Sequence, residues 1–304
     1  MSRSRTVGLF CALAVVWGTT FAGIEVGLDS FPPILYAAYR YELAGLLLLG
    51  FVAADGERWV PERADLQGIG IRALLMFAAF HALLFVGQGY TTSAVAAIVV
   101  GMNPILTAGF AGFLLPGERL SLVGLSGLVT GFAGVVVLAN PDPQDLASGG
   151  GFGEALILVG IGVFALGSVL SQRTSIALRP EATTAWSMFA GGVAAHLLSL
   201  SVGESAAAIE WTAEGITALL WIAVVPGAIG FALYFALLGR IGSVRVNLVN
   251  YVVPIVAAMV GWALLDESFG LTTAAGFLLI FAGFVLVQRR ALREVVPGVV
   301  AASW

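Results

Sequence analysis

The sequence is poor in charged residues and contains no lysine. Only 11% of its 304 residues are charged, whereas 59% are hydrophobic, and the mean hydropathy is +0.99. A water-soluble domain keeps roughly a quarter of its residues charged, because its surface faces water. The net charge of -4 without a basic tract excludes a nucleic-acid-binding protein, since phosphate binding needs clustered Lys and Arg.

Cysteine and histidine are also scarce. The single cysteine, Cys11, lies inside the first apolar run, so an intrachain disulfide and a cysteine metal cluster are both excluded. The two histidines, His81 and His196, belong to no H-E-x-x-H or other metal signature. We therefore expect no metal and no cofactor. His196 has no polar neighbour on its own helical face, which favours a packing role.

Hydrophobic residues occur in runs that are long enough to cross a bilayer. A helix of about 20 apolar residues spans the roughly 30 Å hydrocarbon core. The first run contains Trp17 and Glu25 and is too long for a signal peptide, so we expect a retained helix. The sequence predicts an all-α, polytopic membrane protein with ten transmembrane helices. These helices lie near residues 7–28, 33–54, 68–89, 93–115, 120–139, 152–172, 181–202, 214–238, 243–265 and 270–288.

The arginines are distributed on one side of this arrangement. All fourteen basic residues are arginine, and thirteen of them fall at the same side of the ten predicted helices, whereas the opposite loops carry only acids. Cytoplasmic loops are enriched in basic residues, so we predict a multi-pass cell-membrane protein with both termini in the cytoplasm. The thirteen are Arg3, Arg5, Arg58, Arg63, Arg72, Arg119, Arg173, Arg179, Arg240, Arg245, Arg289, Arg290 and Arg293.

The chain also repeats itself. The heptad FAGVVVL from Phe132 recurs as FAGFVLV from Phe281, and aligning Pro104 with Pro254 also pairs Gly89 with Gly239. Each half has an odd number of helices, so the second half enters the membrane inverted. Inverted repeats can expose a midplane site to either side alternately, which is typical of transporters. The expected parts are a first five-helix repeat (7–139), an extracytoplasmic linker (140–151), a second five-helix repeat (152–290) and a cytoplasmic tail (291–304).

The two aligned prolines, Pro104 and Pro254, interrupt predicted helices. Each removes a backbone donor and frees the carbonyl four residues earlier, which in a membrane must face protein or a wet cavity. Asn247, Asn250 and Tyr251 precede the second proline with the spacing of one helical face. We predict that this face lines a substrate cavity; hydrogen bonding between helices is the alternative.

Two further stripes are candidates for substrate binding. His81 and Gln88 lie seven residues apart on the third helix and therefore share a face. Trp17, Thr20 and Phe21 form a similar stripe on the first helix. Packing with satisfied hydrogen bonds is the alternative for both.

Three charged residues are predicted well inside the membrane. Arg40 and Glu42 lie on the second helix, and Glu25 lies at a similar depth on the first. Buried charges are costly and need partners. One interpretation is a structural ion pair between Arg40 and Glu25. The other is that Arg40 attracts a substrate carboxylate, while Glu42 or Glu25 takes up a proton during transport.

Several motifs together resemble the EamA-type permeases of the drug/metabolite transporter superfamily. They are the ten-helix inverted duplication, WGTTF from Trp17, Arg40, NPIL from Asn103, and LPGERL and LLDESF before the two FAG-bearing helices. The resemblance covers about residues 7–290. It implies a permease, often an exporter of amino acids or related metabolites, with a central cavity between the halves. Phe164 departs from the tryptophan common in the second repeat, and the missing lysine disfavours phosphorylated substrates.

The predicted function is therefore export of small polar or amphipathic metabolites by alternating access, with a proton as the candidate coupling ion. The expected partners are a small-molecule substrate and the lipid bilayer, with a monomer as the functional unit. The alternative is an intramembrane serine protease, because GLSG at Gly124 to Gly127 offers Ser126 as a nucleophile to pair with a histidine.

Overall fold

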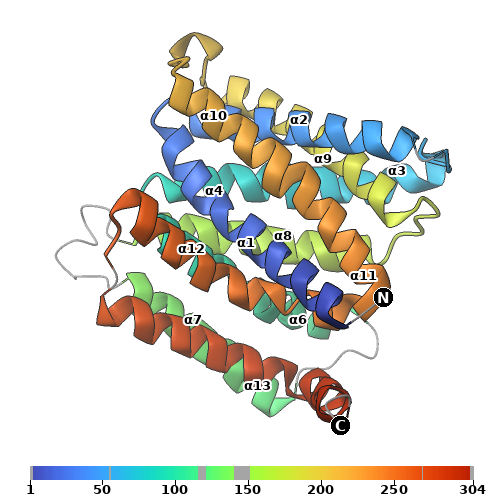
Figure 1. Cartoon of the computed structure of the whole chain (residues 1–304), viewed down its shortest axis with the longest axis vertical. Coiled ribbons are helices and arrows are strands. Elements are labelled where there is room, and N and C mark those ends of the chain that lie inside the picture. The colour runs from blue at the N-terminus through green and yellow to red at the C-terminus, as the bar shows by residue number, and fades with distance from the viewer. Residues whose placement is uncertain (1–2, 55, 116–120, 140–150, 269, 302–304) are drawn as a thin grey trace.

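The computed structural model describes residues 3–54, 56–115, 121–139, 151–268 and 270–301. Almost all of the predicted linker, most of the LPGERL motif and the last residues of the tail lie outside this part of the chain. Within it, all regular structure is helical, and the helices follow the predicted order (Figure 1). The described helices include eight that are long and apolar enough to cross a membrane, with α12 as a shorter apolar helix. The prediction of an all-α, polytopic membrane protein is confirmed.

The ten predicted helices are observed as ten helical stretches in the described ranges, several of which are interrupted. The first five are α1 (Arg3–Leu28), α2 (Pro33–Ala54), α3–η1–α4 (Arg63–Ile71, Arg72–Ala79, Phe80–Gln88), α5–α6 (Ser93–Val100, Asn103–Leu114) and α7 (Leu122–Ala139). The second five are α8 (Phe152–Ser171), α9 (Pro180–Ser201), α10–η3–α11 (Ala213–Ile222, Ala223–Ile229, Gly230–Val246), α12 (Val249–Leu265) and α13 (Leu271–Ala301). A short 3-10 turn, η2 (Ala206–Ala208), precedes α10.

Equivalent helices of the two repeats, α2 and α9, pack against each other in opposite directions. Glu204, which follows α9, accepts hydrogen bonds from the N–H groups of Ile34 and Leu35 at the start of α2, at 3.0 and 2.8 Å. Asp65, which follows α2, accepts hydrogen bonds from the N–H groups of Ala177 and Leu178 just before α9, at 2.8 and 3.2 Å. Each helix therefore begins beside the end of the other, as an inverted repeat requires.

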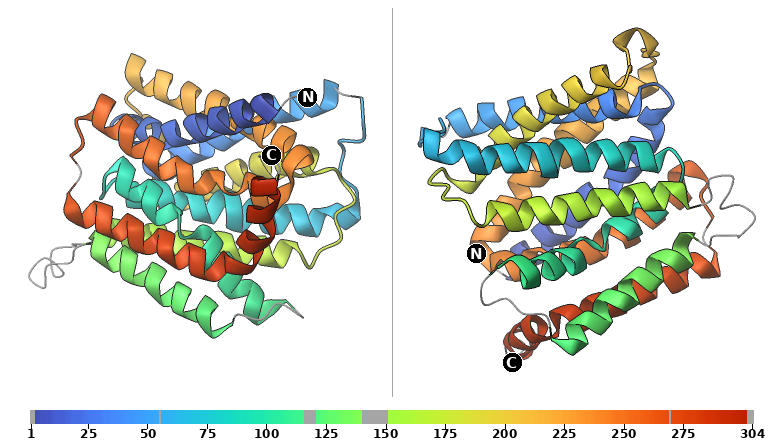
Figure 2. Two further views of the ribbon diagram at one scale, coloured as in Figure 1. Left: turned by 60° about the horizontal axis from the view of Figure 1, so that its bottom comes forward. Right: turned by 180° about the vertical axis from the view of Figure 1, so that it is seen from behind.

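A second equivalent pair, α7 and α13, is joined by glycines. A Cβ atom at Gly127 would lie 2.6 Å from the carbonyl oxygen of Gly283, and one at Gly134 would lie 2.8 Å from that of Gly276. Residue numbers rise along α7 as they fall along α13, so this pair is also antiparallel. Small residues let membrane helices approach this closely. The pair forms a layer at one edge of the molecule (Figures 1 and 2).

The third and eighth membrane helices contain π-helical segments at equivalent positions. These are η1 (Arg72–Ala79) and η3 (Ala223–Ile229), which coincide when Gly89 is aligned with Gly239. Pro226 lies inside η3, but its aligned position in η1 is Met76, so proline alone does not explain the repetition. The segment η1 packs against α9 and η3 against α2. Both irregular segments thus border the antiparallel α2–α9 pair, and π-helical turns are frequent at functional sites.

The fourth and ninth helices are interrupted at different places. The chain turns at Gly101 and Met102, so Pro104 lies in the first turn of α6 and not mid-helix, which corrects the prediction. In the second repeat, α11 is kinked at Gly242, whose φ of 78° and ψ of 167° suit glycine. The predicted helix 243–265 is wrong at its start, because α12 begins only at Val249. Pro254 does lie inside α12.

Candidate functional site

Arg40, on α2, carries a positive charge inside the helix bundle. Its exposed fraction is 5%, and its Nε and Nη1 atoms are buried without a hydrogen-bond partner. Aromatic rings surround it instead: the guanidinium carbon lies 4.9 Å from the centre of the Tyr41 ring and 5.9 Å from that of Phe85. Guanidinium groups stay charged in proteins. The cation–π contacts stabilise this charge only in part.

The predicted ion pair between Arg40 and Glu25 is not formed. Glu25 instead accepts a hydrogen bond from the Nε2 atom of Gln88 at 3.2 Å. The other predicted intramembrane acid, Glu42, lies 2.9 Å from the Nδ1 atom of His196. Two residues along a helix point in different directions, and so Glu42 turns away from the side of α2 that carries Arg40. Among the residues that the structure describes, Arg40 has no carboxylate partner.

His81 lies beside Arg40 but both of its nitrogens are engaged. Its Nδ1 atom donates to the carbonyl oxygen of Phe77 at 3.1 Å, so in the neutral ring Nε2 accepts the hydrogen bond from the hydroxyl of Tyr41. His81 is buried, at 7% exposure. The structure therefore gives His81 the geometry of a residue that positions Tyr41, over whose ring Arg40 lies.

The Glu42–His196 contact joins α2 to α9 across the two repeats. The side chains are 21% and 31% exposed, and the ring of Tyr39 packs edge-on against the histidine, with centroids 5.5 Å apart. The sequence analysis found no polar neighbour for His196 on its own helical face, and the structure supplies one from another helix, Glu42. Its partner is 154 residues distant in the chain and comes from another helix, so no pattern within the seventh predicted helix could reveal it.

Phe21, Glu25 and Gln88 form a second group, between α1 and α4. Gln88 is fully buried, and its Nε2 atom donates to the carbonyl oxygen of Phe21 at 2.6 Å as well as to Glu25. The Gln88 Oε1 atom is buried without a partner. Thr20 is buried next to Phe21 along α1. This group therefore offers one unused acceptor inside the protein.

Trp17 and Asn247 are brought together by a residue that the sequence analysis missed, Tyr234. The rings of Trp17 and Tyr234 stack with centroids 5.5 Å apart, and the Tyr234 hydroxyl donates to the Oδ1 atom of Asn247 at 3.3 Å. Phe231 meets Trp17 edge-on at 5.7 Å. Asn247 lies in the turn before α12, off any helical face, so that part of the prediction is wrong. Arg72, one of the arginines predicted on the cytoplasmic side, lies in η1 and has a buried Nε atom without a hydrogen-bond partner.

Tyr251 and Pro254 lie on the side of α12 that faces α13. The Tyr251 ring is 3.7 Å from that of Phe284, centroid to centroid, and its hydroxyl is buried without a partner. Asn250 is only partly buried. An apolar hollow of about 200 Å³ adjoins Pro254 between α5, α12 and α13. This hollow is not lined by Asn247, Asn250 or Tyr251, so it is not the predicted polar cavity.

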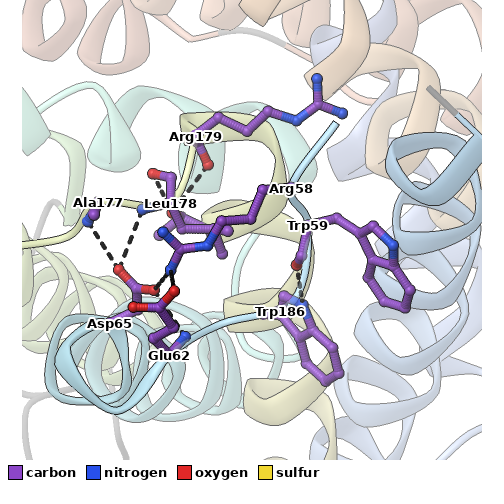
Figure 3. A network of polar contacts seen from close by, with 9 residues as sticks. Arg58, Trp59, Glu62, Asp65, Ala177, Leu178, Arg179 and Trp186 are labelled. Atoms are coloured by element: carbon purple, nitrogen blue, oxygen red, sulfur yellow. Dashed lines mark hydrogen bonds and ion pairs between the residues drawn. The ribbon is translucent and has the colours of Figure 1, made fainter. Parts of the chain in front are cut away.

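A polar network joins the repeats at the end of the bundle where α2 ends and α9 begins (Figure 3). The carboxylate of Asp65 is inaccessible to solvent and also accepts hydrogen bonds from the Nη2 atom of Arg58 at 2.8 Å and from the backbone N–H of Glu62 at 2.9 Å. Beside it, the indole N–H of Trp186 donates to the carbonyl of Trp59 at 2.9 Å. With Glu204 at the other end, an acid anchors the repeats to each other at both ends of the α2–α9 pair.

Ser126 is not placed to act with a histidine. It lies on an exposed face of α7, and its hydroxyl donates to the carbonyl oxygen of Val123 at 2.9 Å. His81 and His196 instead contact α2, through Tyr41 and Glu42. The serine–histidine pair that a protease would need is therefore not assembled. The described residues also contain no group of three His, Cys, Asp or Glu side chains that could hold a metal.

Similar proteins are named as transporters. A sequence model of the EamA-like transporter family matches residues 4–140 and 151–289. The uncharacterized transporter YvbV of Bacillus subtilis (strain 168) is 29% identical over 95% of this chain and 93% of its own. The uncharacterized inner membrane transporter YedA of Escherichia coli (strain K12) is 30% identical over 86% of this chain and 83% of its own. One crystal structure shares the fold, with a TM-score of 0.62 and 21% identity over 95% of this chain and 99% of that one.

Proposed function

Because this chain belongs to the EamA-like transporter family, we propose that it exports small polar or amphipathic metabolites, such as amino acids, by alternating access. The observation that carries the proposal is the placement of unpartnered polar atoms inside an inverted repeat. Arg40, Gln88 and Tyr251 each have a buried polar atom without a partner. Such groups cost free energy in a membrane unless a substrate or water satisfies them.

The antiparallel α2–α9 pair is the proposed axis of the conformational change. The π-helical segments η1 and η3 border it from opposite repeats, and a π-turn can be gained or lost with a small change in backbone hydrogen bonding. Asp65 and Glu204 hold its two ends. In this proposal one repeat rocks against the other about this pair, so that the interior opens to each side in turn.

The Glu42–His196 pair is the proposed proton-coupling element. It lies within the α2–α9 contact, where a change in the relative position of the repeats alters the distance between the two side chains. If the pair separates during the cycle, Glu42 loses this partner, and a proton bound at Glu42 in that state would couple transport to the proton gradient. Glu25, which contacts Gln88, is the second candidate.

We place the protein in the cell membrane as a monomer with both termini in the cytoplasm and the substrate as its partner. The one-sided arginines support this orientation, and both termini lie on the same side of the bundle (Figure 1). The relative YedA is named as an inner membrane transporter. The proposed repeats are 7–139 and 152–290, joined by a linker outside the cytoplasm and followed by a cytoplasmic tail.

Counterflow into proteoliposomes tests the proposal. Purified protein is reconstituted into vesicles loaded with one unlabelled amino acid at a time, and uptake of the same radiolabelled amino acid is measured with and without a pH gradient. We expect counterflow for at least one aromatic or small neutral amino acid, stimulated by the gradient. Glu42→Gln should keep counterflow and lose the stimulation, whereas Glu62→Gln, at an exposed carboxylate, should keep both. Absence of counterflow for every amino acid contradicts amino acids as substrates, and absence of counterflow for every small polar solute tested contradicts the proposed function.

A further inference from the structure

Among the residues that the structure describes, the charge of Arg40 has no counter-ion. Only 5% of its surface is exposed, and it forms no ion pair in the described part of the chain. Two of its donor atoms, Nε and Nη1, have no acceptor. A buried charge without a partner is strongly destabilising, and arginine does not relieve the cost by losing its proton. Such an intramembrane charge is expected to pair with a ligand.

The two acids expected to neutralise this charge have other partners. Glu42 is paired with His196, and Glu25 is hydrogen bonded to Gln88. The acids at the ends of the α2–α9 pair, Asp65 and Glu204, each accept several hydrogen bonds from backbone N–H groups. Among the described residues, none of these acids neutralises Arg40, which points to an anion bound from outside the chain.

The surroundings of Arg40 select the kind of anion. The rings of Tyr41 and Phe85 lie against the guanidinium, and Tyr41 is hydrogen bonded to His81, so the described surroundings of the charge are aromatic. The described structure places one cation here, and the whole chain contains no lysine. A phosphate group carries about -1.5 to -2 charges at pH 7, so it needs more than one cation, whereas a carboxylate matches a single guanidinium.

We propose that Arg40 binds the single carboxylate of the transported substrate. The proposal rests on the proposed transport function and narrows it to monocarboxylates, including amino acids with a free α-carboxyl group. The carboxylate would accept hydrogen bonds from the guanidinium donors that the fold leaves unused. The aromatic walls would contact apolar parts of the substrate next to the carboxylate.

Pairs of acids and their amides test the proposal. Purified full-length protein in detergent is titrated with L-phenylalanine, L-leucine, L-alanine and their α-keto and deaminated acids, each against the corresponding carboxamide, while apparent Tm is followed. Inorganic phosphate is the control anion. We expect an acid to raise the Tm of the wild type, its amide and phosphate not to, and Arg40→Gln to weaken the acid's affinity about 30-fold or more, as expected for a truncated buried charge pair.

A second readout needs no ligand. If Arg40 awaits a substrate, removing its charge relieves an unpaired buried cation, so unliganded Arg40→Gln should melt at or above the Tm of the wild type. Arg173→Gln, at an exposed arginine, is the matched control and should behave like the wild type in both assays. Arg40→Lys should retain the charge and lose most of the affinity, because its ammonium lacks the planar fork.

Several results would overturn the inference. A Tm of Arg40→Gln clearly below that of Arg173→Gln would make Arg40 a structural residue. If acids and amides shift the Tm equally, or if no acid of the panel raises it, Arg40 does not bind a substrate carboxylate. Counterflow of uncharged solutes by both the wild type and Arg40→Gln would refute the inference while leaving the proposed transport function intact. Absence of counterflow for all solutes would instead refute the transport function itself.

Discussion

Replacing Glu204 by alanine tests how the two repeats are joined. The carboxylate accepts three hydrogen bonds, from the backbone N–H groups of Ile34 and Leu35 and from the hydroxyl of Ser199 at 2.7 Å. Losing a cap of this kind costs about 0.5–2 kcal/mol. Ser199 is fully buried and would lose its acceptor, which costs about 1–3 kcal/mol. Allowing for partial rearrangement, we expect Glu204→Ala to destabilise the protein by about 2–4 kcal/mol.

The assay is thermal unfolding in detergent, followed by intrinsic tryptophan fluorescence. A loss of this size corresponds to a fall in apparent Tm of about 4–10 °C for a chain of this length. Glu204→Gln keeps one acceptor oxygen and should fall in between. Glu210→Ala, at an exposed acid of the same connection, should change stability by less than about 0.5 kcal/mol. If Glu204→Ala melts like Glu210→Ala, the α2–α9 anchor contributes nothing and the reasoning fails.

Three further predictions concern helix packing, membrane topology and the protease alternative. Gly127→Val should lower Tm by several degrees because its side chain meets the backbone of Gly283, whereas Gly162→Val has open space at its Cβ and should not; equal shifts would refute the close α7–α13 packing. In a Cys11→Ser background, a membrane-impermeant maleimide should label Glu210→Cys in intact cells and Arg173→Cys only after permeabilisation, and the reverse would invert the proposed topology. Ser126→Ala should leave both counterflow and Tm unchanged; intact counterflow together with loss of a proteolytic activity would revive the protease alternative.

Much of the fold could be predicted from local sequence patterns. Apolar runs separated by polar segments locate membrane helices because each helix must satisfy its own backbone in lipid. The repeated FAG heptads, together with WGTTF and NPIL, carried the family resemblance, and the match of the EamA-like family model confirms it. The inverted arrangement followed from an odd number of helices in each half. The antiparallel contacts of α2 with α9 and of α7 with α13 confirm it.

Local sequence patterns could not predict the helix irregularities or the side-chain pairs, because both depend on residues of a neighbouring helix. The π-helical turn at η1 has no proline to announce it, unlike η3 with Pro226. The start of the ninth helix was mispredicted because the chain is kinked at Gly242. Glycine is too common in membrane helices for a single glycine to indicate a kink. The contacts of His196 and Tyr234 were missed because their polar partners lie outside their own helices, Glu42 on α2 and Asn247 in the turn before α12.

Composition and the order of residues along one helix at a time were enough to predict a membrane protein with ten helices in two inverted repeats, because each of these features depends on local sequence. The partners of Glu25, Arg40 and Glu42 became clear only in three dimensions. Glu42 contacts His196 and Glu25 accepts a hydrogen bond from Gln88, whereas Arg40 lies among aromatic rings. The physical reason is that pairing depends on side chains only a few ångströms apart in space, brought together from helices that are distant in the chain.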